Sequence, residues 1–293
     1  MKKYFLLFFL LLIPLASADC GITNLADCIS QSFFNFFLSI INSPIQPLLD
    51  AVNYLLTQPV NIDLFSSVWG IIVYMLSLFY GLLLMYVGFM FIISGHSVEK
   101  REKAKTDLAN ILIMIVLVQA SFYLYSLLIQ IVASFSTIIL NMVPNNFFLL
   151  TIENITNIGL ELSLVMPYLA SILITLILLT LRYIIVSSGV LLFAIGIFMY
   201  FIPPLNYYGR FLINFVIASI SITIVYSIIF LASSMLLEVG IFDNFKILVM
   251  IGAFTLVNAI TIIITLFVLI KVASKVASPV MKVVSAVGAV TGA

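Results

Sequence analysis

The sequence predicts an all-α integral membrane protein. Of its 293 residues, 64% are hydrophobic and only 8% are charged, whereas soluble domains carry roughly 45–50% apolar and about 25% charged residues. The charges cluster between apolar runs that reach the length of about 20 residues needed to cross a bilayer as a helix. A β-barrel would alternate apolar and polar residues over stretches of about 10 residues, and runs such as 172–181 do not alternate.

Residues 1–18 are predicted to be a cleaved signal peptide. Lys2 and Lys3 form a basic start, residues 4–15 form an apolar core, and Ala16-Ser17-Ala18 has the small residues of a cleavage site. The alternative is an uncleaved first span, but this apolar core is short of the ~20 residues that a span requires. The mature chain is therefore expected to begin at Asp19, outside the cytoplasm.

The two cysteines of the chain, Cys20 and Cys28, follow this cleavage site. On the non-cytoplasmic side a disulfide persists, and we expect these two residues to form one. Because the two Cα atoms must lie within about 7 Å, the segment between them has to fold back. Such a bond would stabilise the fold by roughly 2–3 kcal/mol.

Residues 19–63 are expected to remain outside the membrane core. Residues 29–57 have an amphipathic pattern with helical spacing that Pro44 and Pro47 interrupt. Segments of this kind lie in the membrane interface or pack on neighbouring helices. Both interpretations place interfacial helices on the extracytoplasmic face.

Five spans are predicted between residues 64 and 270, at 64–93, 108–140, 167–202, 211–237 and 247–270. A six-span arrangement with a turn at Arg182 competes with this one. Lys and Arg concentrate in short cytoplasmic loops, and five spans leave only Lys246 outside. The N-terminus is then outside and the basic tail 271–293 is cytoplasmic, in the cytoplasmic membrane. The residues assigned to cytoplasmic basic loops are Lys100, Arg101, Lys103, Lys105, Arg210, Lys271, Lys275 and Lys282.

The third predicted span is too long for a bilayer. As a straight helix it would extend about 54 Å, against a hydrocarbon core of about 30 Å. It must therefore protrude, or bend near Ser187-Ser188-Gly189 or Gly196, where a helix is easily distorted.

Polar residues recur at helical spacing within the spans. They either mediate packing between helices or line a water-filled path, and the sequence leaves both open. Arg182 stands in the middle of the third span, where arginine is costly and faces protein, lipid phosphate or water. It is either a locally satisfied side chain or part of a subunit interface or conduit. The other polar residues are Gln119, Tyr123, Ser126, Gln130, Asn214, Ser221, Asn258 and Thr265.

The sequence offers no set of catalytic groups. It has one histidine, two cysteines near the N-terminus and no acidic residue in the middle of a span. We therefore expect no enzyme activity, metal or cofactor, and no proton- or cation-coupled transport. Lys271, Lys275 and Lys282 would share a helix face suited to anionic lipid headgroups. Asn154-Ile155-Thr156 is a sequon that makes Asn154 a candidate for glycosylation.

Two stretches resemble a known group of membrane proteins. One is Phe91-Ile92-Ile93-Ser94-Gly95 followed by the charged residues 99–105, and the other runs from Phe193 through Pro203-Pro204 to Arg210-Phe211-Leu212. With the order of the spans, they resemble the TrbL-type polytopic subunits of type IV secretion and conjugation machines, near archaeal DNA-import relatives of the CedA kind. The first stretch is also similar to the turn of TrbC-type pilins.

This resemblance implies a homo-oligomeric subunit of a larger membrane assembly. Its partners would be membrane lipids and other secretion or conjugation subunits, including a pilin and an ATPase, with DNA or protein as the transported substrate. The chain departs from the group in lacking a large soluble outer domain and a tryptophan after the arginine turn, where Phe211 and Leu212 stand. A small-solute permease and a non-conducting membrane scaffold remain the alternatives.

Overall fold

The computed structural model describes residues 25–144, 147–150, 158–239 and 245–291, and every regular element in them is helical. The long helices follow from continuous apolar sequence with few breaking residues. In chain order, the elements are α2 (Leu25–Thr57), the short 3₁₀ helix η2 (Asp63–Phe65), α3 (Ser66–Ile93), the 3₁₀ helix η3 (Ser94–His96), α4 (Val98–Leu140), α5 (Ile158–Phe201), α6 (Asn206–Leu236) and α7 (Lys246–Thr291).

The prediction of five spans is confirmed within the described residues. Five helices are long and apolar enough to cross a membrane, namely α3 with η2, α4, α5, α6 and the first part of α7. The six-span alternative is wrong, because α5 passes through Arg182 as one uninterrupted helix. The chain therefore has the helices of a multi-pass membrane protein.

Two helices extend beyond their predicted spans. The charged residues 99–105 were expected to be in a loop, but they form the first turns of α4, and only η3 and Ser97 separate this helix from α3. Glu and Lys are good helix formers, and Glu99 precedes Lys103 by one helical turn, which supports the helix. At the other end of the chain, the backbone of α7 remains helical past Pro279 as far as Thr291.

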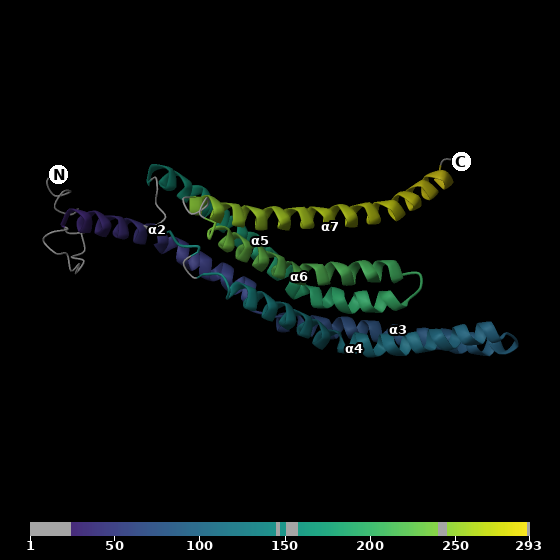
Figure 1. The fold of residues 1–293 in the computed structure, drawn as a ribbon. Coiled ribbons are helices and arrows are strands. Elements are labelled where there is room, and N and C mark those ends of the chain that lie inside the picture. Colours follow the sequence, from purple (N-terminus) through teal and green to yellow (C-terminus); the bar gives the residue numbers. More distant parts are fainter. Residues whose placement is uncertain (1–24, 145–146, 151–157, 240–244, 292–293) are drawn as a thin grey trace.

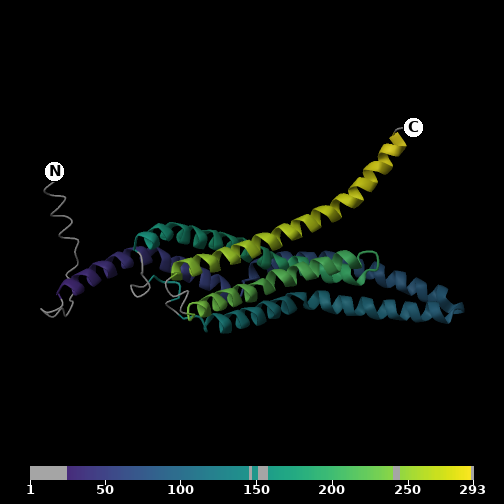
Figure 2. The ribbon, with the colours of Figure 1, turned by 45° about the horizontal axis from the view of Figure 1, so that its top comes forward.

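The helices form two hairpins with long helices beside them (Figure 1). Helices α3 and α4 make one hairpin and α5 and α6 make the other, and the end of the first projects beyond the turn of the second (Figures 1 and 2). The last part of α7 diverges from the bundle (Figure 2).

Helix α2 packs on neighbouring helices over its second half. Ile45 and Val52 are buried in one apolar cluster with Ile172 of α5 and Val143, which follows α4. The helix is continuous through Pro44 and Pro47, so the two amphipathic segments of the sequence form one element. This is the second of the two interpretations of residues 29–57, packing on neighbouring helices.

The core of the bundle consists of two separate apolar clusters. One joins α2, the beginning of α5, the end of α6 and the beginning of α7, with Tyr168, Phe230 and Phe254 among its fully buried side chains. The other joins α3, the middle of α4, the end of α5 and the first half of α6. Helix α5 runs through both clusters, and its residues change from the first to the second between Leu179 and Val186.

Small residues allow α5 and α6 to approach closely in the second cluster. A Cβ on Gly196 would lie 3.1 Å from Cγ1 of Ile213, and one on Gly209 would lie 2.6 Å from Cα of Tyr200. Gly196, considered as a bending point from the sequence, lies within one uninterrupted helix. Its hydrogen side chain makes room for α6.

Candidate functional site

Arg182 lies at the boundary between the two apolar clusters. It is buried, with 8% of its surface exposed, close to the middle of the membrane-spanning part of α5. A buried cation in such a position requires hydrogen-bond acceptors, because its desolvation is otherwise unfavourable by several kcal/mol. The contacts of its guanidinium group therefore define the centre of the candidate site.

Backbone carbonyls of α6 accept these hydrogen bonds. Nε of Arg182 donates to the carbonyl oxygen of Ser219 at 3.1 Å, and Nη2 donates to that of Ile220 at 3.2 Å. The hydroxyl of Thr223 also donates to the Ile220 carbonyl, at 2.9 Å. Within the described part of the chain, Arg182 has no carboxylate partner, so peptide dipoles rather than an ion pair stabilise its charge.

A small cavity adjoins Arg182 and reaches the end of α2. Its volume is about 10 Å³, and Gln58, Pro59 and Thr223 contribute to its walls. A cavity of this size is close to the least that holds one water molecule, and such a water needs polar neighbours. Arg182, Gln58 and Thr223 provide donors and acceptors of that kind.

The connection between α2 and α3 is a break in helical structure that lies against α4 and α5, with Val60 and Ile62 buried and Asn61 exposed. The backbone amide of Asn61 donates to the hydroxyl of Tyr183 at 3.0 Å, and the hydroxyl of Ser187 donates to the backbone carbonyl of Asn61 at 2.6 Å. Thr137 of α4 donates to the carbonyl of Thr57 at 3.3 Å. Backbone groups outside a helix need other hydrogen-bond partners, and side chains of α4 and α5 provide them for Thr57 and Asn61.

We refer to Arg182, Asn61, Tyr183, Ser187 and Tyr125 of α4 as the polar layer. Tyr125 is fully buried, and its hydroxyl donates to the carbonyl of Val186. Gly189 makes room for this ring, since a Cβ there would overlap the Tyr125 hydroxyl. The triplet Ser187-Ser188-Gly189 was expected as a bending point of an overlong helix, and its observed role is to receive the α2–α3 connection and Tyr125.

A second polar group lies nearer the start of α7. Asn258 is buried, and its Nδ2 donates to the carbonyl of Ser171 at 3.2 Å. Its Oδ1 has no hydrogen-bond partner among the described residues. Tyr226 and Thr261 are hydrogen-bonded to each other one turn away. Thr265, predicted to share the face of Asn258, is exposed and donates only to the carbonyl of Thr261 in its own helix.

The predicted polar stripe on α4 faces away from the bundle. Gln119 and Gln130 are exposed, Tyr123 is 76% exposed and Ser126 is half-buried. Gln130 donates to the hydroxyl of Ser126 at 3.2 Å. The side chains of Gln119 and Tyr123 have no hydrogen-bond partner in the described part of the chain, so the stripe does not mediate packing inside the monomer.

The remaining predicted residues do not join these groups. Asn214 is exposed and Ser221 is half-buried on α6. Lys100, Arg101, Lys103 and Lys105 are exposed on the first turns of α4, not in a loop. Arg210 belongs to α6, with its guanidinium 5.5 Å from the centre of the Tyr200 ring. The predictions on Asn154, on the Cys20–Cys28 disulfide and on the side chains of Lys271, Lys275 and Lys282 lie outside the described residues.

Several residues of the polar layer were not predicted from the sequence. Asn61, Tyr125 and Tyr183 have partners on other helices, but nothing in their spacing distinguishes them from other polar residues of the chain. One available signal was Pro59, which stands with polar neighbours between two apolar segments. A proline in that position indicates a helix break.

Comparison of the sequence with models of protein families and with curated proteins, and of the fold with solved structures, gives no match.

Proposed function

We propose that this protein is a subunit of an oligomeric membrane assembly that moves DNA or protein across the cytoplasmic membrane, as in type IV secretion, conjugation or DNA import. The observation that carries the proposal is the uncovered polar stripe of α4, formed by Gln119, Tyr123, Ser126 and Gln130. A membrane protein acting alone would place such groups inside its bundle or at the membrane surface.

The position of the stripe supports contact with another protein. It lies in the apolar part of α4, and the opposite face of the helix, with Met114, Val118 and Tyr125, is fully buried within the monomer. Amide and hydroxyl groups lose hydrogen bonds when they face hydrocarbon, at an estimated cost of roughly 2–7 kcal/mol each without compensation. A second copy that presents its own stripe would supply both donors and acceptors.

No single contact would hold such an assembly. Polar contacts between membrane helices contribute only about 0.6–2 kcal/mol each, so assembly depends on several of them together. Four polar residues over three turns of α4 provide a surface of that kind. We therefore place the homo-oligomer interface on this face of α4, with a pilin and an ATPase as further partners of the complex.

The proposal that the assembly moves DNA or protein rests on the sequence resemblance, and the fold is compatible with it. The two stretches that carry the resemblance contain the α3–α4 and α5–α6 turns, which lie toward the same end of the bundle (Figures 1 and 2). The exposed residues Lys100, Arg101 and Lys103 are near the first turn, and Arg210 is near the second. A basic end is typical of the cytoplasmic side, where an ATPase would dock.

Disulfide crosslinking in native membranes tests the interface. In a background with Cys20→Ser and Cys28→Ser, Gln130→Cys should crosslink to a second copy. Ile131→Cys is the matched control, because Ile131 is also exposed, at 44%, at the same depth but about 100° around the helix. Equal crosslinking of both variants would remove the support for this interface.

A transfer assay in a deletion strain tests the function. Loss of the gene should abolish DNA or protein transfer, and the wild-type copy should restore it. A monomeric protein whose deletion leaves transfer unchanged, and which moves a small solute when reconstituted alone in liposomes, would instead be a permease.

A further inference from the structure

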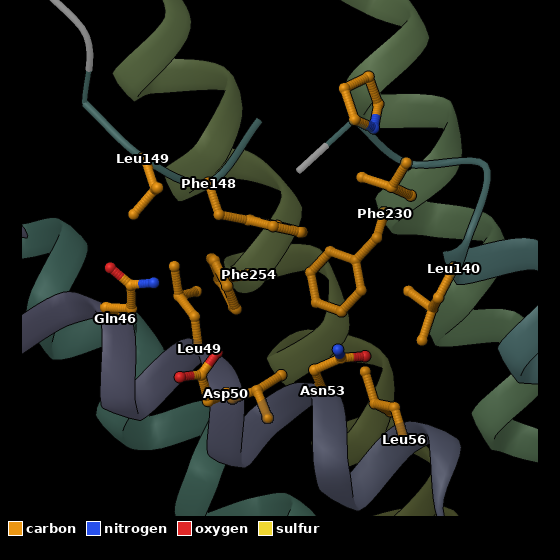
Figure 3. A pocket seen from close by; sticks show the side chains of 13 residues that line it. Gln46, Leu49, Asp50, Asn53, Leu56, Leu140, Phe148, Leu149, Phe230 and Phe254 are labelled. Atoms are coloured by element: carbon orange, nitrogen blue, oxygen red, sulfur yellow. The ribbon is translucent and has the colours of Figure 1, made fainter. Parts of the chain in front are cut away.

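A cavity lies between α2, the end of α4 and the segment after it, α6 and α7 (Figure 3). Its volume is about 290 Å³. This is near the lower limit of about 300–1,000 Å³ that small-molecule sites occupy. One wall of the cavity is polar and the facing wall is aromatic, and this difference indicates the chemistry of a ligand.

One wall is polar and belongs to α2. Gln46, Asp50 and Asn53 follow one another at helical spacing and line the cavity (Figure 3). Asp50 is the only charged residue among the thirteen that line it. Gln46, Asp50 and Asn53 are exposed at the mouth of the cavity, and within the described part of the chain the Asp50 carboxylate has no basic partner.

The facing wall is a trio of aromatic rings. The ring centroid of Phe148 lies 5.3 Å from that of Phe230 and 5.7 Å from that of Phe254, and the latter two are 5.1 Å apart. Phe230 and Phe254 are almost fully buried, at 1% and 0% exposure, so packing fixes their positions. The faces of aromatic rings are negative and attract cations, most strongly where water is excluded.

We propose that this cavity binds an amphiphilic organic cation, an ammonium group carried on an apolar body. The carboxylate of Asp50 pairs with the ammonium group, the amides of Gln46 and Asn53 orient it, and the aromatic trio receives the apolar part. An anion would meet Asp50 with no basic residue in the lining, and a neutral apolar molecule would leave the carboxylate and amides unused. The ammonium group belongs either to a free amphiphilic amine or to the headgroup of phosphatidylethanolamine, whose phosphate would have to stay outside the cavity.

Calorimetric titration of the full chain in maltoside micelles tests the site, with benzyltrimethylammonium as the probe. The wild-type protein should bind this cation, and Asp50→Asn should weaken binding roughly tenfold or more, the effect of removing a charged partner. Asp50→Glu should retain most of the affinity. Asp63→Asn is the matched control, an exposed aspartate outside the cavity, and should bind as the wild type does.

The aromatic contribution is tested separately. Phe254→Leu keeps an apolar wall but removes a ring that would pack against the benzyl group of the probe, so affinity should fall roughly three- to fivefold. Thermal unfolding of each variant shows whether the fold is retained. Phosphatidylethanolamine that competes with the probe identifies the lipid as the source of the ammonium group, and its failure to compete identifies a free amine. Unchanged affinity in Asp50→Asn, equal binding of phenylacetate, or no binding of the cation would overturn the proposal.

Discussion

The Nε atom of Arg182 lies 3.1 Å from the carbonyl oxygen of Ser219, so a cation in the middle of α5 is bound by the backbone of α6. Because Nη2 binds the next carbonyl as well, the planar guanidinium bridges two peptide units with a fixed geometry that a lysine ammonium lacks. The contact joins two neighbouring spans where the two apolar clusters meet.

Arg182→Leu should therefore lower the yield of the membrane complex and the efficiency of transfer. The expected fall is roughly fivefold, which corresponds to losing about 1 kcal/mol of hydrogen bonding between helices. Arg182→Lys should have an intermediate effect, and Asn154→Gln should have much less. Complex yield after mild detergent extraction and the transfer assay measure this, and wild-type values for Arg182→Leu would show that the arginine is dispensable.

Gly189 gives a prediction about stability. A Cβ there would overlap the hydroxyl of Tyr125 and lie 3.3 Å from its Cζ, so Gly189→Ala should destabilise the protein by about 1–3 kcal/mol. Gly88→Ala is the control, because a Cβ on Gly88 would meet no atom within 4 Å, and alanine favours a helix over glycine. Thermal unfolding in detergent compares the two, and equal midpoints would contradict the observed packing.

The number of spans could be predicted from the sequence because it depends on apolar length and on the placement of Lys and Arg. Helix ends were less predictable. The first turns of α4 are charged, so hydropathy indicated a loop, although residues such as Glu99 and Lys103 are compatible with a helix. Spacing also grouped polar residues correctly on one face of α4, but a single sequence does not tell whether that face points inward or outward.

The polar layer depends on contacts between residues far apart in the sequence. Asn61 and Ser187 are 126 positions apart, and the Ser187 hydroxyl donates to the backbone carbonyl of Asn61. The spacing of side chains along the sequence does not predict a hydrogen bond to a backbone carbonyl. The position of Arg182 could be recognised as unusual from its apolar surroundings. Its hydrogen-bond partners could not be predicted from the sequence, because every residue has a backbone carbonyl group.

The orientation of the bundle gives a further prediction. In a background with Cys20→Ser and Cys28→Ser, Lys103→Cys and Lys282→Cys should react with a membrane-impermeant maleimide only after the cells are opened. Met142→Cys, at an exposed position after α4, should react in intact cells. Labelling of Lys282→Cys in intact cells would contradict a cytoplasmic C-terminus.

The last prediction concerns the break between α2 and α3, and two adjacent serines of α5 allow a matched comparison. Ser187 is 2% exposed and donates to the carbonyl of Asn61 at 2.6 Å. Ser188 donates only within its own helix, to the carbonyl of Ile185 at 3.2 Å. Ser187→Ala should destabilise the fold by about 1 kcal/mol, because the hydrogen bond between the buried Ser187 hydroxyl and the Asn61 carbonyl is lost.

Ser188→Ala should change stability by less than about 0.5 kcal/mol, as expected for a substitution outside the core. Tyr183→Phe removes the acceptor of the Asn61 amide, and its effect should combine non-additively with that of Ser187→Ala, because both side chains bind the same residue. Thermal unfolding in detergent of the single variants and the double variant measures this coupling. If Ser187→Ala and Ser188→Ala were equally stable, the Ser187 hydroxyl would not stabilise the α2–α3 connection.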